Sequence, residues 1–196
     1  MSELLPRTLN ICGKDYEIRT DFRDILVIFK VLDDNSLTDR EKAYITLRCL
    51  FYDYEKLPYD GLEEAVKKAF WFVGGGDIPK TKDKGYKVID YEHDGFMLYP
   101  AVSKTLGVID VRDLDYLHWF TFLGAFSEHS DGLLSFVMSL RGKIHEGKKL
   151  EKHEKEFLND NKDIVIVHSK QDLDAIAETE KFLDSIGKQD EKEILL

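Results

Sequence analysis

Apolar and polar residues alternate over two short stretches near the N-terminus, residues 9–12 and 15–18. A period of two is the signature of a β-strand with one buried face. The pair Gly13-Lys14 between them suits a two-residue turn that needs a positive φ at its first position. The pattern predicts a small β-hairpin, which must pack on the helices that follow because an isolated hairpin is only marginally stable in water.

Over most of the remaining chain, apolar residues recur every three or four positions, which is the spacing of one helix face. The segments with this spacing are residues 22–32, 38–51, 62–72, 94–106, 116–126, 133–144, 150–159 and 173–186. Thr38 and Glu41 have the T-x-x-E spacing of a capping box, and the glycines at 74–76 predict the end of a helix and a linker. Pro100 predicts a kink or a boundary within its segment, and residues 164–167 have the pattern of a short β-like run.

These segments predict a mainly α protein, a compact helical domain with a small N-terminal β-hairpin and a C-terminal helical extension. We expect the helical domain to cover residues 1–162, with Asp94 as an N-cap inside it. Residues 163–196 hold 4 basic and 9 acidic residues and form the predicted acidic extension. Its apolar stripe is a candidate partner-binding surface, and the alternative is that the stripe packs on the protein's own core. The stripe consists of Leu173, Ile176, Phe182 and Leu183.

Residues 116–126 form the most aromatic segment of the chain. Apolar residues lie all round the predicted helix, so we expect it to be buried on most sides. Gly124 would let a neighbouring element approach closely. His118, beside Trp119, is best interpreted as a core histidine bonded to a backbone carbonyl or a carboxylate. The cluster therefore predicts core packing, and not a stacking platform for nucleic acid.

The composition fits a globular protein that stays in the cytosol of the cell that makes it. Of the 196 residues, 43% are hydrophobic and 12% are aromatic. Acidic residues outnumber basic ones 38 to 28, and this net charge of −10 disfavours nucleic-acid binding. Cys12 and Cys49 fit a reducing compartment. The apolar run at residues 25–29 is too short for a signal peptide or a membrane span.

The candidate chemical groups form no enzyme motif in the sequence. None of the six histidines has the spacing of a metal site. No serine lies in a nucleophile elbow, and the glycines at 74–76 lack the Gly-Lys-Ser/Thr ending of a phosphate-binding loop. We therefore expect a non-catalytic protein with no metal and no other cofactor.

One series of residues resembles a known family. It consists of Tyr91, Glu92 and Asp94, then Leu117, His118, Trp119 and Phe122, then Arg141, and then Gly147, Lys148 and Lys149 before a charged segment at 150–157. In this order it resembles the phage gene-product-fifteen family of siphophages that infect Gram-positive bacteria, over about residues 5–160. Phe120 stands where the family has a second tryptophan, and Pro100 is a further departure from the pattern.

The resemblance implies a tail assembly chaperone that binds the tape measure protein and keeps it soluble during tail morphogenesis. It implies no catalytic residue. The expected location is the host cell cytoplasm, with the protein absent from the mature virion. The tail tube protein and a second copy of the chain are further candidate partners. Two alternatives stay open, a structural tail component retained in the virion and an undetected enzyme or nucleic-acid binder.

Overall fold

The computed structural model describes residues 5–76 and 88–167. The predicted hairpin is confirmed and consists of β1 (Thr8–Ile11) and β2 (Lys14–Glu17), paired antiparallel with Leu9 opposite Tyr16. Its turn residues are Cys12 and Gly13, with φ values of 51° and 81°, and not the predicted Gly13-Lys14 pair. Because both turn residues adopt positive φ, the turn has the twist that favours tight hairpins.

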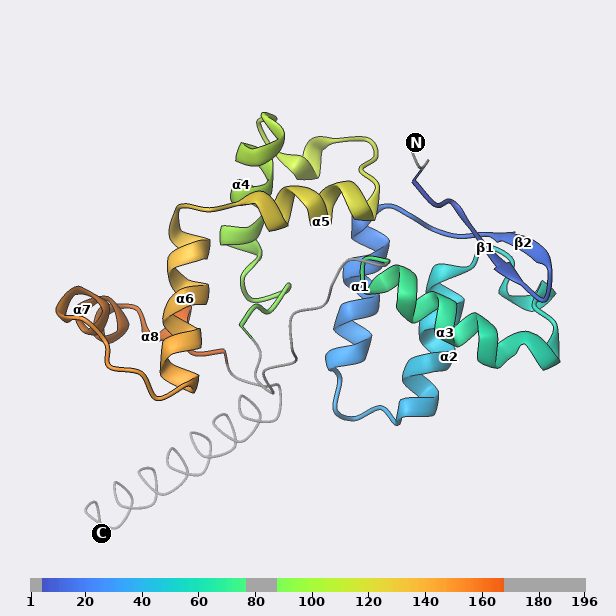
Figure 1. Cartoon of the computed structure of the whole chain (residues 1–196), viewed down its shortest axis with the longest axis horizontal. Helices are drawn as coiled ribbons and strands as arrows, with labels where there is room; N and C mark the ends of the chain where they lie inside the picture. Colours follow the sequence, from blue (N-terminus) through green and yellow to red (C-terminus); the bar gives the residue numbers. More distant parts are fainter. Residues whose placement is uncertain (1–4, 77–87, 168–196) are drawn as a thin grey trace, which may run out of the picture. The chain divides into compact units, whose positions relative to one another are not determined.

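The mainly α prediction is also confirmed (Figure 1). The α-helices within the described residues are α1 (Phe22–Asp33), α2 (Asp39–Leu50), α3 (Leu62–Val73), α4 (Gly95–Leu106), α5 (Trp119–Glu128), α6 (Leu133–His145), α7 (Lys152–Asp160) and α8 (Lys162–Val165). Short 3-10 helices are η1 (Tyr54–Lys56), η2 (Tyr59–Gly61) and η3 (Val111–Asp113). The capping box predicted from Thr38 and Glu41 is present at the start of α2.

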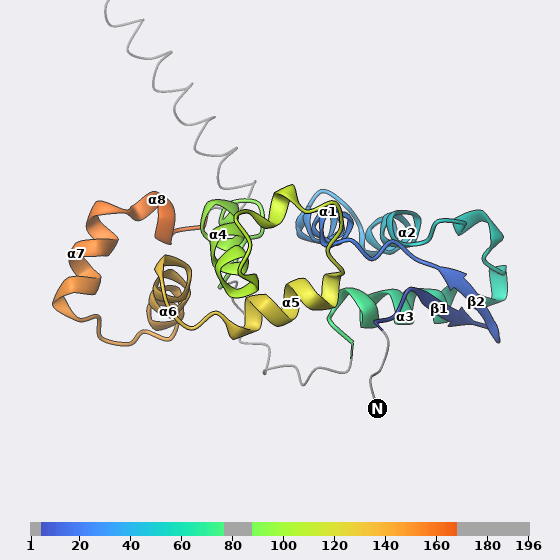
Figure 2. The ribbon, with the colours of Figure 1, turned by 90° about the horizontal axis from the view of Figure 1, so that it is seen from above.

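The core forms where α1 packs against α2 and α5, and α3 packs against α2 and β1 (Figure 2). The largest buried side chains are aromatic and come from α1, α3 and α5 and from the residue after α2. They are Phe22, Phe51, Phe72, Trp119 and Phe122. The hairpin contributes Leu9, Ile11 and Tyr16 to the same core, as its alternating pattern requires.

The aromatic segment differs from its prediction in two ways. Its helix, α5, begins at Trp119 and not at residue 116, because Leu117 and His118 are extended and pair with the chain before α1. Trp119, Phe122 and Ala125 are buried, and Phe120, Leu123 and Phe126 are partly buried and pack against the core, so α5 is covered on most of its sides as predicted. Among the described residues, no neighbouring element packs closely against Gly124, because the space beside its Cα is open.

Two further local predictions are corrected. Helix α4 continues through Pro100 from Gly95 to Leu106, so the segment has no boundary at the proline. Ile164 and Val165 belong to α8 and not to a β-like run. The glycines at 74–76 end α3 as predicted, with Gly74 as the C-cap. Gly76 has a φ of 77° and lies against the ring of Phe120, so a side chain there would be both strained and crowded.

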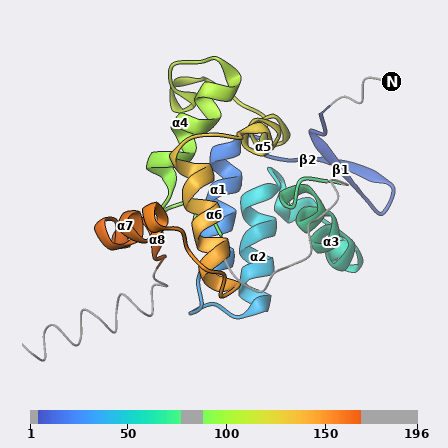
Figure 3. The ribbon, with the colours of Figure 1, turned by 60° about the vertical axis from the view of Figure 1, so that its left-hand side comes forward.

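The chain forms one compact unit over residues 1–165, in which α6 packs against α4 and α8, and α8 against α7 (Figure 3). The predicted boundary at residue 162 falls at the first residue of α8. The predicted stripe of Leu173, Ile176, Phe182 and Leu183 lies outside the described residues. Within the described ranges, the helices are too short or too polar to cross a membrane.

Candidate functional site: the Asp94–Arg141 node

The turn before α4 directs the carboxylate of Asp94 into the protein. Asp90 Oδ1 accepts hydrogen bonds from the backbone N–H groups of Glu92 and His93, at 2.9 and 2.8 Å. Asp94 Oδ2 accepts from the Asp90 amide at 2.8 Å. Asp94 is the N-cap residue of α4, but its side chain makes no capping bond to the helix. The predicted N-cap position is therefore correct, but the carboxylate of Asp94 bonds to groups outside the helix.

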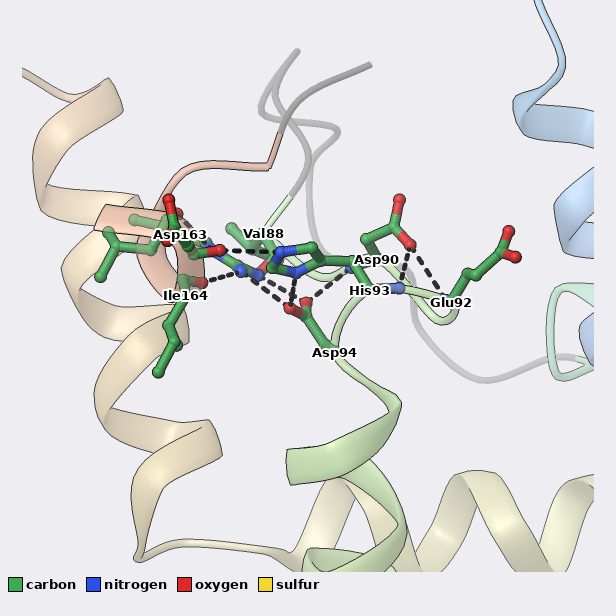
Figure 4. Close-up of polar contacts among 9 residues, drawn as sticks. Val88, Asp90, Glu92, His93, Asp94, Asp163 and Ile164 are labelled. Carbon is green, nitrogen blue, oxygen red and sulfur yellow. Dashed lines mark hydrogen bonds and ion pairs between the residues drawn. The ribbon is translucent and has the colours of Figure 1, made fainter. Parts of the chain in front are cut away.

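Asp94 forms a buried ion pair with Arg141 of α6 (Figure 4). Arg141 Nη1 donates to Asp94 Oδ2 at 2.5 Å and Nη2 donates to Oδ1 at 2.8 Å, which is the bidentate geometry of a strong pair. The exposed fraction is 3% for the Arg141 side chain and 0% for that of Asp94. Two charges this deep are tolerated only when they are paired and hydrogen-bonded.

The remaining donors of Arg141 reach three backbone carbonyls. Nε donates to Val165 O at 2.9 Å, and Nη2 donates to Ile164 O at 2.7 Å. Nη1 donates to Val88 O at 3.0 Å. All five N–H donors of the guanidinium are thereby used. Arg141 fixes two separate backbone segments against α6, the end of α8 and the residues leading into α4.

His93 completes the node. Its Nδ1 lies 2.8 Å from Asp94 Oδ1, and its Nε2 lies 2.8 Å from the backbone oxygen of Asp163. Together with the bonds from Arg141, the last three carbonyls of α8 therefore have partners. The last carbonyls of a helix find no backbone N–H donor within the helix, so cationic side chains commonly donate hydrogen bonds to them.

The node keeps Asp94 ionised. Burial alone would raise the pKa of this carboxyl. The hydrogen bonds from Arg141, the Asp90 amide and His93 outweigh the burial, and the pKa lies below its ordinary value of 3.8.

The other half of the turn contacts α1. The ring of Tyr91 lies 4.7 Å from that of Phe29, and Glu92 pairs with Lys30 at 2.6 Å. Burial raises the pKa of Tyr91 to about 12, with a smaller contribution from the charge of Asp33. Residues 91 and 92 thus face α1, while residues 93 and 94 face α6 and α8.

Phe29 also meets the aromatic segment, because its ring lies 5.7 Å from that of Trp119. Trp119 Nε1 donates to Val73 O at 3.0 Å and so ties α5 to α3. His118 Nδ1 accepts from the Phe120 amide at 3.0 Å, and its Nε2 donates to Pro6 O at 2.9 Å. This neutral tautomer confirms the predicted core histidine, and burial lowers its pKa.

These features coincide with the residues that carried the resemblance. Residues 1–166 match the family described as Bacteriophage Gp15 protein. The chain belongs to this Gp15 family. Membership indicates a bacteriophage protein of virion structure or morphogenesis. No curated protein and no solved structure shows a significant match to this Gp15 family member.

Sequence reasoning missed the node, although one signal for it exists. Leu134, Val137 and Arg141 lie at i, i+3 and i+7 on α6 and are all buried. A cation in an apolar stripe predicts a buried carboxylate partner, because a lone buried charge is prohibitively costly. The side chains of the node all contact one another or backbone. Among the described residues, no cluster of three or more acidic, histidine or cysteine side chains could hold a metal ion.

Proposed function

We propose that this Gp15 family member is a tail assembly chaperone of a siphophage that infects Gram-positive bacteria. It binds the tape measure protein in the host cytoplasm, keeps it soluble during tail morphogenesis and leaves before the virion matures. It acts without catalysis and without a cofactor. Family membership supports the phage part of this proposal, and the surface of the protein supports the binding part.

The observation that carries the binding role is a surface of tyrosine and arginine at the end of α2, the Tyr–Arg surface. It consists of Arg19, Tyr44, Arg48, Tyr52 and Tyr54. Arg48 lies over the rings of Tyr44 and Tyr54, at 5.9 and 5.6 Å from their centroids. Arg19 lies 4.6 Å from the centroid of Tyr52.

This surface is both exposed and ordered. Tyr44 is 47% exposed and Tyr52 is 57% exposed. Arg19 is anchored because its Nη1 donates to the carbonyls of Cys49 and Phe51 at 2.9 and 3.0 Å. Tyrosine and arginine dominate the energetic centres of protein interfaces, and side chains that are already positioned lose less entropy on binding. The surface therefore suits a helical partner that carries exposed apolar side chains.

Co-expression with the tape measure protein of the same phage tests the proposal. The tape measure is expected to be soluble when the chaperone is present and to aggregate when it is absent. The variant Tyr44→Ser/Tyr52→Ser should reduce the soluble fraction. Phe96→Ser is the matched control, because Phe96 is 53% exposed and lies on α4. A tape measure that aggregates equally with and without the wild-type chaperone contradicts the proposal.

Mass spectrometry of purified virions distinguishes the chaperone from a structural tail component. A chaperone is absent from virions, whereas a component is present at a fixed ratio to the tail tube protein. Pull-down with the tail tube protein and size-exclusion chromatography of the chain alone test the two further candidate partners. The stripe of Leu173, Ile176, Phe182 and Leu183 stays a prediction for a second binding surface, and alanine substitutions in the same solubility assay test it.

A further inference from the structure

The two ring nitrogens of His93 both face oxygen acceptors. Nδ1 faces a carboxylate oxygen of Asp94 and Nε2 faces the carbonyl oxygen of Asp163, each at 2.8 Å. A neutral imidazole has one N–H and one lone pair, so one of these contacts would set a lone pair against an oxygen. Only the doubly protonated ring makes two hydrogen bonds here. The geometry is that of an imidazolium.

The surroundings of the ring can hold this charge. In its own turn lie the carboxylates of Asp90, Glu92 and Asp94, and Glu92 is paired with Lys30 of α1. From α6, Arg141 brings a second cation to the carboxylate of Asp94. The C-terminal carbonyls of α8 offset this excess positive charge, because their partly negative oxygen atoms face both cations.

On α8 itself, Asp163 carries a negative side chain next to the positive charge of Lys162. The His93 side chain is 35% exposed, so the ring can exchange protons with solvent. Asp94 is wholly buried behind it. The second proton of the His93 ring, which makes the second hydrogen bond of the ring possible, can therefore exchange with water.

We propose that His93 is a protonation-dependent clamp that holds the end of α8 to the Asp94–Arg141 node. When the ring loses a proton, the remaining N–H stays on the carboxylate of Asp94, because a charge-assisted bond is the stronger of the two. The carbonyl of Asp163 then loses its donor, and α8 is held by Arg141 alone. Rising pH loosens α8 without breaking the buried ion pair.

Nitrogen-15 NMR of the full chain tests the protonation state directly. At pH 7, both ring nitrogens of His93 are expected to show the chemical shifts of a protonated ring. The exposed rings of His145 and His153 serve as internal references in the same sample. A neutral-tautomer signature for His93 at pH 7 overturns the proposal, and this measurement requires no variant.

Hydrogen exchange tests the clamp. The amides of Ile164 and Val165 donate to Asn161 O and report the opening of α8. His93→Gln keeps one donor and should raise their exchange roughly tenfold at pH 6, which corresponds to the loss of about one hydrogen bond. The ratio of variant to wild-type exchange should approach one as pH rises to 9.

The matched control is His153→Gln. His153 lies on α7, with its ring 6.2 Å from that of Phe136, and makes no bond to the node among the described contacts. This control should leave the exchange of Ile164 and Val165 unchanged. Equal exchange in wild type and His93→Gln at pH 6 overturns the clamp, and so does a variant-to-wild-type ratio that does not change with pH.

Discussion

The node around Asp94 joins the turn before α4 to α6 and α8, and the aromatic packing around Trp119 joins α5 to α1 and α3, but the two regions hold their elements together by different physics. Around Trp119 the contacts are ring on ring, as in the stacked pairs Phe22–Phe122 at 4.7 Å and Trp119–Phe122 at 5.7 Å. At the node the contacts are directional bonds, which Arg141, His93 and the Asp90 amide make to oxygen acceptors. Apolar burial supplies most of the stabilising free energy of a fold. A buried ion pair supplies little net stability, but its directional bonds form only when the paired elements are in one relative position.

The difference assigns a role to each region. The aromatic region stabilises the unit and tolerates substitutions that keep its volume. The node positions the end of α8 against α6, because Arg141 donates to Ile164 O and Val165 O. Phe29 touches Tyr91 and Trp119, so the two regions meet on α1.

The largest effect is expected when the aromatic region is broken. Trp119→Ala should lower the free energy of unfolding by about 3–5 kcal/mol, because it leaves a cavity and strands the carbonyl of Val73 without its donor. Chemical denaturation of the purified chain measures this change. Trp71 is only partly buried, so Trp71→Ala is the matched control and should cost less. A loss below about 1 kcal/mol in Trp119→Ala would show that the aromatic region is not the main source of stability.

Breaking the node should cost about 3 kcal/mol. Arg141→Met keeps the length of the side chain but leaves the carboxylate of Asp94 buried without its cation. The comparison sharpens in the double variant Arg141→Met/Asp94→Asn, which removes both charges and should recover part of the loss. Denaturation of the single and double variants measures the coupling. Additive losses would show that the pair contributes no specific interaction.

The two regions should also lose stability in different pH windows. The pKa of His118 is lowered in the folded protein, so only the unfolded chain gains a proton as pH falls below its ordinary 6.5. The pKa of Asp94 is lowered from 3.8, so its contribution is lost progressively as pH falls below 3.8 and through the still lower folded value. Acid therefore weakens the aromatic region first and the node last.

Thermal unfolding between pH 7 and pH 2.5 measures both windows. His118→Gln should flatten the curve below pH 6.5 and leave the acid limb in place. The control variant is His145→Gln, which changes an exposed histidine outside the aromatic region. An unchanged slope in His118→Gln would contradict the assignment of the upper window to His118.

The sequence predicts the core packing of the aromatic region, but it does not predict the node. Period and capping signals predict the hairpin and α1 to α7 to within about three residues, because each signal depends on neighbours a few residues apart. The partner of Arg141 lies 47 residues earlier in the chain, and the carbonyls of α8 lie up to 24 residues later. Because every residue has a backbone carbonyl, the sequence does not show which carbonyls accept hydrogen bonds from Arg141.

The same limit explains the error at α5. The sequence shows eleven largely apolar residues at 116–126, and their periodicity does not reveal that His118 pairs with Asp21 and that Leu117 O accepts a hydrogen bond from the Phe22 amide. Tertiary hydrogen bonds decided where the helix begins. The stripe that ends in Leu183 is predicted from periodicity alone, and its role in partner binding stays a prediction.

The smallest effect is expected from a truncation, and its position follows from the node. Ending the chain after Val167 keeps the carbonyls of Asp163, Ile164 and Val165 for His93 and Arg141, so the free energy of unfolding should change by less than about 0.5 kcal/mol. Ending it after Lys162 removes those acceptors and should cost about 1–3 kcal/mol, because buried donors of Arg141 lose their partners. Comparison of the two truncations by denaturation separates the two cases. Equal stability after either truncation would show that the end of α8 does not contribute to the node.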